Sequence, residues 1–142
     1  MRSIVLVAVT GLGLLLAGCA TDVGPSEAEL KARWEAQNIF PATYKNDLLA
    51  FLRTYLNDPE HVRAAQVSQP LRKTIGQGER YVVCVRYQER KADGKYAPPK
   101  EGAATYVSAK LDRFFDAPPA EVKAICKDVP LAPFPELEQL KR

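Results

Sequence analysis

Residues 80–90 read RYVVCVRYQER, and this stretch decides the fold. Alternate side chains of a β-strand point to opposite faces, and here apolar residues occur near the centre of both sets. One set contains Tyr81, Val83, Val85 and Tyr87, and the other contains Val82, Cys84, Arg86 and Gln88. The pattern predicts a strand that is covered on both sides for part of its length.

Two helices are predicted before this strand. Ser26 and Glu29 have the spacing of a capping box, which indicates a short helix from there to about Asn38. A second, amphipathic helix begins after Thr43 and ends at residues 57–59, which read NDP. Its apolar stripe consists of Tyr44, Leu48, Phe51, Leu52, Tyr55 and Leu56. Such a stripe indicates a core face and not a ligand site.

Two more strands and one helix complete the prediction. Residues 61–68 favour a first strand that stops before Pro70, and residues 103–115 favour a third strand after a long hairpin connection. From Pro118 a helix is expected, whose inward face is formed by Val122, Ile125, Cys126 and Val129. The expected fold class is α+β: a small antiparallel sheet of about three strands packed with an N-terminal amphipathic helix and a C-terminal helix.

The amino terminus reads as a secretion signal. An apolar run over residues 4–16 follows Arg2 and ends at the small residues Ala17 and Gly18, directly before Cys19. The run is too short to span a bilayer comfortably. Residues 1–18 are therefore expected to be a signal peptide, residues 19–25 a tether, and residues 26–142 a single periplasmic α+β domain.

The segment around Cys19 resembles the processing site of bacterial lipoproteins. The resemblance implies that Cys19 carries a diacylglycerol on its sulfur and an acyl chain such as palmitate on its amino group. Two or three acyl chains anchor a protein firmly in a membrane. Ala20 and Thr21 follow, without an Asp at the second mature position. By the rule for enteric lipoproteins, this favours the periplasmic face of the outer membrane over the inner membrane. An ordinary cleaved signal and a transmembrane anchor are the alternatives.

Cys84 and Cys126 are the two cysteines that remain once Cys19 is assigned to lipid. In an oxidising compartment, such an even pair predicts a disulfide. The chain-entropy model gives a loop of this length about 4 kcal/mol of stabilisation. We expect the bond to join the central strand to the last helix.

Charge and motifs exclude several functions. The chain has 20 Lys and Arg against 17 Asp and Glu, a formal charge of +3, which provides no basic footprint for nucleic acid. No residues have the spacing of a zinc site, and residues 76–78 (GQG) lack the lysine of a phosphate loop. We therefore expect no metal and no cofactor.

Catalysis has one weak candidate. His61, the only histidine, could activate Cys84 as a nucleophile, because thiolate chemistry needs a base within hydrogen-bond reach. A cysteine in an apolar strand with a second cysteine available is more often structural. We therefore expect no catalytic residue and no enzyme activity.

One segment combines basic and aromatic residues. The predicted hairpin connection carries Arg90, Lys91, Lys95, Tyr96 and Lys100, and Arg86 precedes it on the strand. Such a loop suits contact with an anionic partner, for example lipid headgroups, lipopolysaccharide or peptidoglycan carboxylates. The alternative is a solvated loop whose charges keep a sheet edge soluble.

Three blocks carry a wider resemblance: residues 44–59 (YKNDLLAFLRTYLNDP), residues 80–87 (RYVVCVRY) and residues 133–137 (PFPEL). They resemble a family of small lipoproteins from alphaproteobacteria. This resemblance implies a location and no activity, so no functional residue follows from it. The order of a helix and three strands also resembles the small lipoprotein of the outer-membrane β-barrel assembly machine, in layout only.

Three functions follow as hypotheses. The first is a non-catalytic outer-membrane lipoprotein, an accessory or envelope-maintenance component that acts by contact with an envelope protein. The second is a periplasmic binding module for an anionic envelope ligand, which would use Arg86, Lys95 and Tyr96. The third is a thiol enzyme that would use Cys84.

Overall fold

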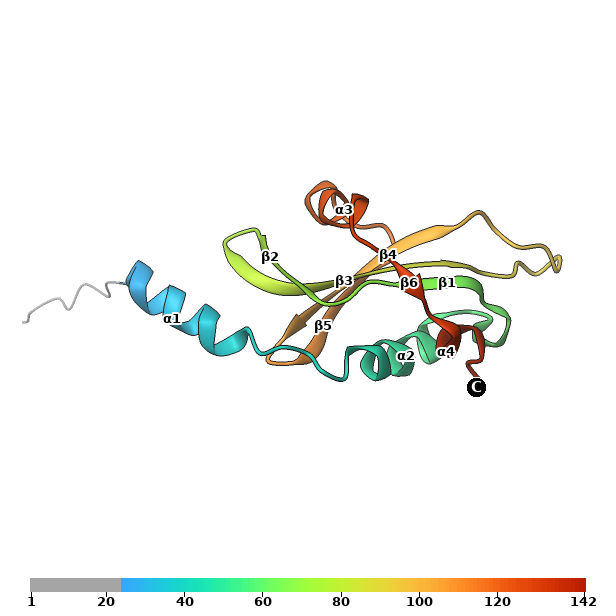
Figure 1. Ribbon diagram of the computed structural model, residues 1–142, viewed down its shortest axis with the longest axis horizontal. Coiled ribbons are helices and arrows are strands. Elements are labelled where there is room, and N and C mark those ends of the chain that lie inside the picture. The colour runs from blue at the N-terminus through green and yellow to red at the C-terminus, as the bar shows by residue number, and fades with distance from the viewer. Residues whose placement is uncertain (1–23) are drawn as a thin grey trace, which may run out of the picture.

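The computed structural model describes residues 24–142. The expected signal peptide, Cys19 and most of the expected tether lie outside these residues. Within residues 24–142, none of the helices is long and apolar enough to cross a membrane. The described chain forms an antiparallel sheet with helices on both of its faces (Figure 1).

The first two helices form where the sequence predicts them. α1 (Glu27–Gln37) begins with the capping box, in which the Ser26 hydroxyl accepts a hydrogen bond from the Glu29 amide and the Glu29 carboxylate accepts one from the Ser26 amide. α2 (Tyr44–Tyr55) buries Tyr44, Leu48 and Leu52. A short 3-10 helix, η1 (Pro59–His61), follows α2, so His61 lies in a turn before the first strand.

Within residues 24–142, six strands form the sheet. They are β1 (Arg63–Val67), β2 (Leu71–Ile75), β3 (Gly78–Gln88), β4 (Lys100–Val107), β5 (Lys110–Phe115) and β6 (Ala132–Pro133). The order is β5-β4-β3-β1-β6, and β2 pairs with β3 beside β1. All pairs are antiparallel. Two helices near the end, α3 (Ala120–Lys127) and α4 (Pro135–Glu138), complete the chain.

The α+β class is confirmed, but the prediction of about three strands is wrong because the sheet has six. Residues 103–115, predicted as one strand, contain most of β4 and all of β5. The two strands are joined by a turn at Ser108 and Ala109, whose φ angles are 50° and 61°. β2 and β6 were not predicted, and the layout resemblance to a helix followed by three strands does not hold.

The sheet has a core on each face. On one face α2 and α4 cover a large cluster that contains Val83, Val85 and Tyr87 of β3. On the other face α3 covers a smaller cluster that contains Val82 and Cys84. Figure 1 shows α3 on the side of the sheet opposite to α2 and α4. The prediction that the central strand is covered on both sides is confirmed.

The molecule is elongated, with a helix at one end and a hairpin connection at the other. α1 lies at one end and the connection between β3 and β4 lies at the other (Figure 1). No residue of α1 is buried, so this helix contributes little to either core. α1 and the β3–β4 connection thus lie at opposite ends of the sheet (Figure 1).

Candidate functional site

The candidate site is the connection between β3 and β4, residues 89–99, which we call the hairpin tip. Its backbone is ordered by local hydrogen bonds. The Lys91 amide donates to the Lys95 carbonyl at 2.8 Å, and the Gly94 amide donates to the Lys91 carbonyl at 2.9 Å. The Asp93 carboxylate accepts from the Lys95 amide at 2.9 Å. Gly94 has a φ of 79°, a left-handed conformation that glycine adopts without strain.

Two of the predicted basic residues are neutralised by carboxylates. The Arg90 guanidinium lies 2.9 Å from Asp58, and the Lys100 ammonium lies 3.2 Å from Glu89. Hydrogen bonds from His61 and Arg90 hold the pKa of Asp58 below its usual range, so Asp58 stays ionised at neutral pH. Arg90 and Lys100 therefore fix the base of the hairpin tip and offer little net charge to a partner.

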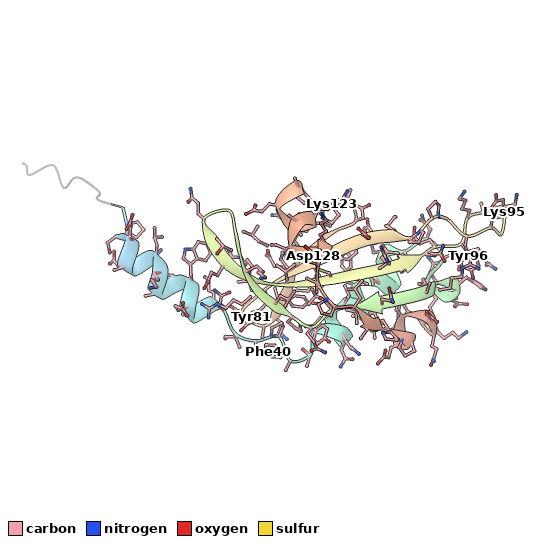
Figure 2. The ribbon with its side chains drawn as sticks, turned by 45° about the horizontal axis from the view of Figure 1, so that its top comes forward. Phe40, Tyr81, Lys95, Tyr96, Lys123 and Asp128 are labelled. Carbon is pink, nitrogen blue, oxygen red and sulfur yellow. A yellow bond between two sulfur atoms is a disulfide. The ribbon has the colours of Figure 1, made fainter. Side chains whose placement is uncertain are left out.

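The aromatic residue of the tip is also engaged within the protein. The Arg63 guanidinium lies 3.7 Å from the centre of the Tyr96 ring, and Tyr96 pairs with Arg90 through an isolated β-bridge. This stacking leaves Tyr96 half-buried. Figure 2 shows Lys95 and Tyr96 together at the far end of the molecule.

Of the predicted contact residues in the hairpin tip, Lys91 and Lys95 are the two whose charges are not engaged by other described residues. Both are exposed, and within residues 24–142 neither forms an ion pair. Lys91 also lines a hollow of about 610 Å³ between the tip and the end of α2, beside Asn57 and Asp58. The tip thus presents two free cations on an ordered turn.

Arg86 does not belong to the hairpin tip. Its guanidinium lies 2.7 Å from Glu101, its register partner on β4. Arg86 and Cys84 alternate with the buried Val83 and Val85, so Arg86 lies on the α3 face of the sheet. The prediction that Arg86 and the loop residues form one surface is therefore not supported by their placement.

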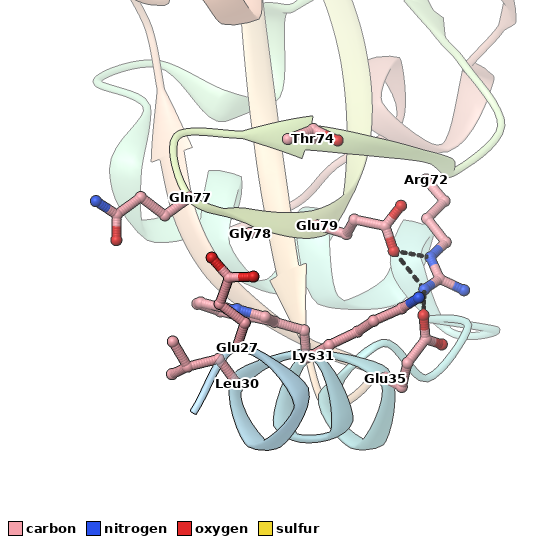
Figure 3. Close-up of a pocket in the computed structure, with 10 residues that line it drawn as sticks. Glu27, Leu30, Lys31, Glu35, Arg72, Thr74, Gln77, Gly78 and Glu79 are labelled. Atoms are coloured by element: carbon pink, nitrogen blue, oxygen red, sulfur yellow. Dashed lines mark hydrogen bonds and ion pairs between the residues drawn. The ribbon is translucent and has the colours of Figure 1, made fainter. Parts of the chain in front are cut away.

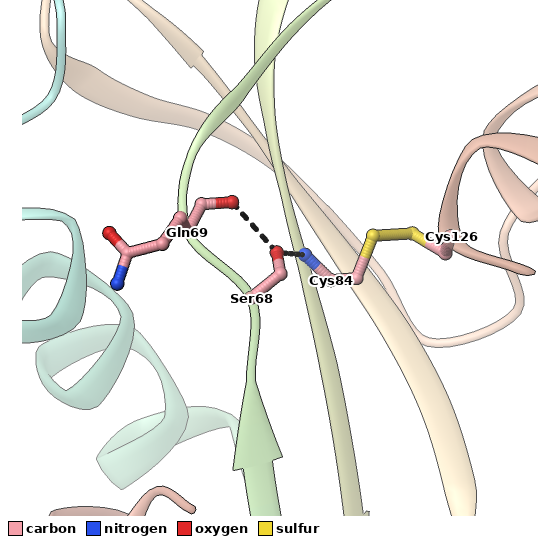
Figure 4. Close-up of a disulfide and its surroundings, with 4 residues drawn as sticks. All are labelled: Ser68, Gln69, Cys84 and Cys126. Atoms are coloured by element: carbon pink, nitrogen blue, oxygen red, sulfur yellow. Dashed lines mark hydrogen bonds between the residues drawn. A yellow bond between two sulfur atoms is a disulfide. The ribbon is translucent and has the colours of Figure 1, made fainter. Parts of the chain in front are cut away.

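The predicted disulfide is present. Cys84 of β3 is bonded to Cys126 of α3, with their Cα atoms 5.7 Å apart. As Figure 4 shows, the Ser68 hydroxyl accepts a hydrogen bond from the Cys84 amide at 2.8 Å and donates one to the Gln69 carbonyl at 2.9 Å. Ser68, which lies between β1 and β2, thus provides a hydrogen-bond partner for a backbone amide of β3. No pattern in the sequence indicated this role.

Comparison with protein families, curated proteins and solved structures finds no match.

Cys84 and His61, the nucleophile and base of the thiol-enzyme hypothesis, do not form such a pair in this structure. The sulfur of Cys84 is bonded to Cys126, so it carries no thiol. The His61 ring nitrogen Nδ1 lies 2.8 Å from Asp58 Oδ1. Within residues 24–142, no three His, Cys, Asp or Glu side chains are grouped as metal ligands would be.

A second surface, which the sequence did not indicate, lies where α1 meets the β2–β3 hairpin. Trp34 covers Gly78 so closely that a Cβ atom there would lie 2.8 Å from the indole. The Arg80 guanidinium lies 4.3 Å from the Trp34 ring. Arg72 joins the two elements, because it pairs with Glu35 of α1 and with Glu79 of β3 (Figure 3). These side chains hold α1 in place although none of its own residues is buried.

Proposed function

We propose that this chain is a non-catalytic outer-membrane lipoprotein, anchored through Cys19, that acts by contact with an envelope protein at the hairpin tip. The observation that carries the proposal is the placement of α1 and the hairpin tip at opposite ends of the molecule (Figure 1). An anchor at one end and an ordered basic turn at the other suit a protein that reaches from a membrane to a partner.

Chain length supports the position of the anchor. The five residues that follow Cys19, up to Gly24, extend over at most about 18 Å, so a lipid on Cys19 would hold the start of the described chain close to the membrane. α1 adds 11 residues, or about 16 Å of helix. The hairpin tip then faces away from that membrane, which favours a partner in the periplasm over the headgroups beside the anchor.

The chemistry of the tip supports an acidic partner surface. Lys91 and Lys95 are exposed cations on a turn that is already ordered, so binding costs little conformational entropy in the backbone. Exposed cations at a rim raise the association rate with an acidic surface and make the rate sensitive to salt. Asp93, whose carboxylate accepts a hydrogen bond from the Lys95 amide, holds the turn in its shape.

The proposal is tested by co-purification from cells. The wild-type protein and the double variant Lys91→Glu with Lys95→Glu are extracted in a neutral detergent, and captured envelope proteins are quantified by mass spectrometry. Lys110→Glu with Lys31→Glu, which carries the same charge change elsewhere, is the control. We expect an envelope protein that is captured by the wild type and the control and is depleted at least tenfold with the tip variant. Equal capture by all three proteins would refute the proposal.

A second candidate is a binding module for an anionic envelope molecule at the same tip. The observation that favours it is the absence of ion pairs at Lys91 and Lys95 within residues 24–142. Charge reversal at Lys91 and Lys95, which leaves the Lys100–Glu89 pair at the base of the tip intact, should then abolish binding to purified peptidoglycan or lipopolysaccharide. Unchanged binding of this double variant would remove the candidate.

A further inference from the structure

A groove of about 640 Å³ lies between α3 and the sheet, on the face opposite to α2. The Cys84–Cys126 disulfide, Gly102, Val129 and Leu131 are among the residues that line it. Ala120 and Ala124, one helical turn apart on α3, also line the groove with small side chains. Its volume falls within the range of about 300–1,000 Å³ that is usual for small-molecule sites.

The walls of this groove are fixed. The disulfide ties α3 to β3, and Val122 of α3 is packed with Val82 and Ala103 beneath it. α3 contains only eight residues, so it covers the part of the sheet around Val82 and Cys84 and leaves the neighbouring part around Arg86 open. The groove therefore lies where the short helix leaves the sheet uncovered.

The rim of the groove is cationic. Its charged residues are Arg86, Lys123, Lys127 and Glu101, that is, three cations and one anion. Arg86 pairs with Glu101 through Nη2 alone, which leaves the other donors of its guanidinium free. Within the described part of the chain, Lys123 and Lys127 form no ion pair. Figure 2 shows Lys123 on α3, above the sheet.

We propose that this groove binds a free amphipathic carboxylate of the medium-chain fatty acid type. The alkyl chain lies over the disulfide and against Val129 and Leu131, because these apolar side chains are only partly buried in the protein itself. The carboxylate lies toward Arg86, Lys123 and Lys127, which together exceed the charge of Glu101. A guanidinium that already binds one carboxylate has the planar geometry to bind a second. The proposal is independent of the contact at the hairpin tip.

Methyl NMR of the full chain tests the site directly. The protein is held in nanodiscs of zwitterionic phosphatidylcholine and titrated with sodium octanoate. We expect saturable shifts of the Val129 and Leu131 methyl groups, and none of the Val62 methyl groups, which belong to the core on the other face. Octyltrimethylammonium, which has the same chain and the opposite charge, should give no saturable shift. Equal shifts with both amphiphiles, or none with octanoate, would overturn the proposal.

Two variants test the apolar and the charged halves of the site separately. Ala124→Trp fills the groove from an exposed helix position, and Lys123→Gln with Lys127→Gln removes two rim charges. Each should raise the Kd for octanoate at least tenfold, whereas Lys110→Gln should not change it. The Leu48 methyl shifts, from the core on the other face, report that each variant is folded. If the groove responds only to phosphatidylglycerol in the nanodisc, or only to an acidic peptide, the assignment to a free carboxylate is wrong.

Discussion

The hydroxyl of Tyr106 donates a hydrogen bond to the backbone carbonyl of Tyr44 at 2.9 Å. The bond joins β4 to the first turn of α2 inside the larger core, where both residues are buried. Tyr87, one strand away in the same core, is equally buried, but within residues 24–142 its hydroxyl has no hydrogen-bond partner. Burial raises the pKa of both phenols, so neither is expected to ionise in the folded protein below pH 10.

Removal of these two hydroxyl groups should have unequal effects. Tyr106→Phe leaves the Tyr44 carbonyl without its partner and should lower the free energy of unfolding by about 1–2 kcal/mol. Tyr87→Phe removes a buried hydroxyl that has no protein partner and should be neutral or stabilising by up to about 1 kcal/mol. Urea unfolding followed by circular dichroism measures both values. Equal losses in the two variants would contradict the hydrogen-bond assignment.

Gly78→Ala should displace α1 from the β2–β3 hairpin. A Cβ atom at this position would lie 2.8 Å from the Trp34 ring, so the indole must move into solvent. Because Trp34 is the only tryptophan of the chain, its fluorescence reports this directly, and we expect a shift of the emission to longer wavelength. Gly24→Ala, where an added Cβ meets nothing within 4 Å, is the control. An unshifted spectrum in Gly78→Ala would show that α1 is held differently.

The turn between β4 and β5 should be stabilised by glycine. Ala109 has a φ of 61°, a left-handed conformation that disfavours residues with a Cβ atom, so Ala109→Gly should stabilise the protein by about 1 kcal/mol. Ala50→Gly, the same chemical change at an exposed position inside α2, should destabilise it by about 1 kcal/mol. The two urea midpoints should therefore move in opposite directions, and a common direction would contradict the turn conformation.

The disulfide should contribute a large share of the stability. Replacement of Cys84 and Cys126 by Ala should lower the free energy of unfolding by about 2–4 kcal/mol, because the unfolded chain loses its cross-link. A reducing agent should lower the Tm of the wild type and leave that of the double variant unchanged. Peptide mass spectrometry of the native protein should find both cysteines bridged. A free Cys84 in protein isolated from cells would instead revive the thiol-enzyme hypothesis.

Local patterns were enough to predict part of the fold. The stripe on α2, the capping box of α1 and the alternation in β3 are all set by residues close in sequence. The Cys84–Cys126 bond was predicted by elimination from the cysteine count. The β4–β5 turn was missed because residues 107–110 read VSAK, without the Asn-Gly or Asp-Gly that usually marks a two-residue hairpin.

The candidate site was only partly predictable, since charge pairing depends on distant segments. Sequence reasoning grouped six basic and aromatic residues, but Asp58 neutralises Arg90 from 32 positions away and Glu101 pairs with Arg86. Arg63 stacks on Tyr96 in the same way. Within residues 24–142, Lys91 and Lys95 form no ion pair, although the residues beside them, Arg90 and Tyr96, are engaged by Asp58 and Arg63.

The central claim is that the hairpin tip, and not the α1 end, contacts a partner in the envelope. Site-specific photo-crosslinking in living cells tests it most directly, with a photoreactive residue in place of Lys95 and, separately, in place of Lys31 on α1. The account predicts an adduct from position 95 with the same envelope protein that co-purifies, and loss of that adduct when Lys91→Glu is added. An adduct with that protein from position 31 and none from position 95 would contradict it.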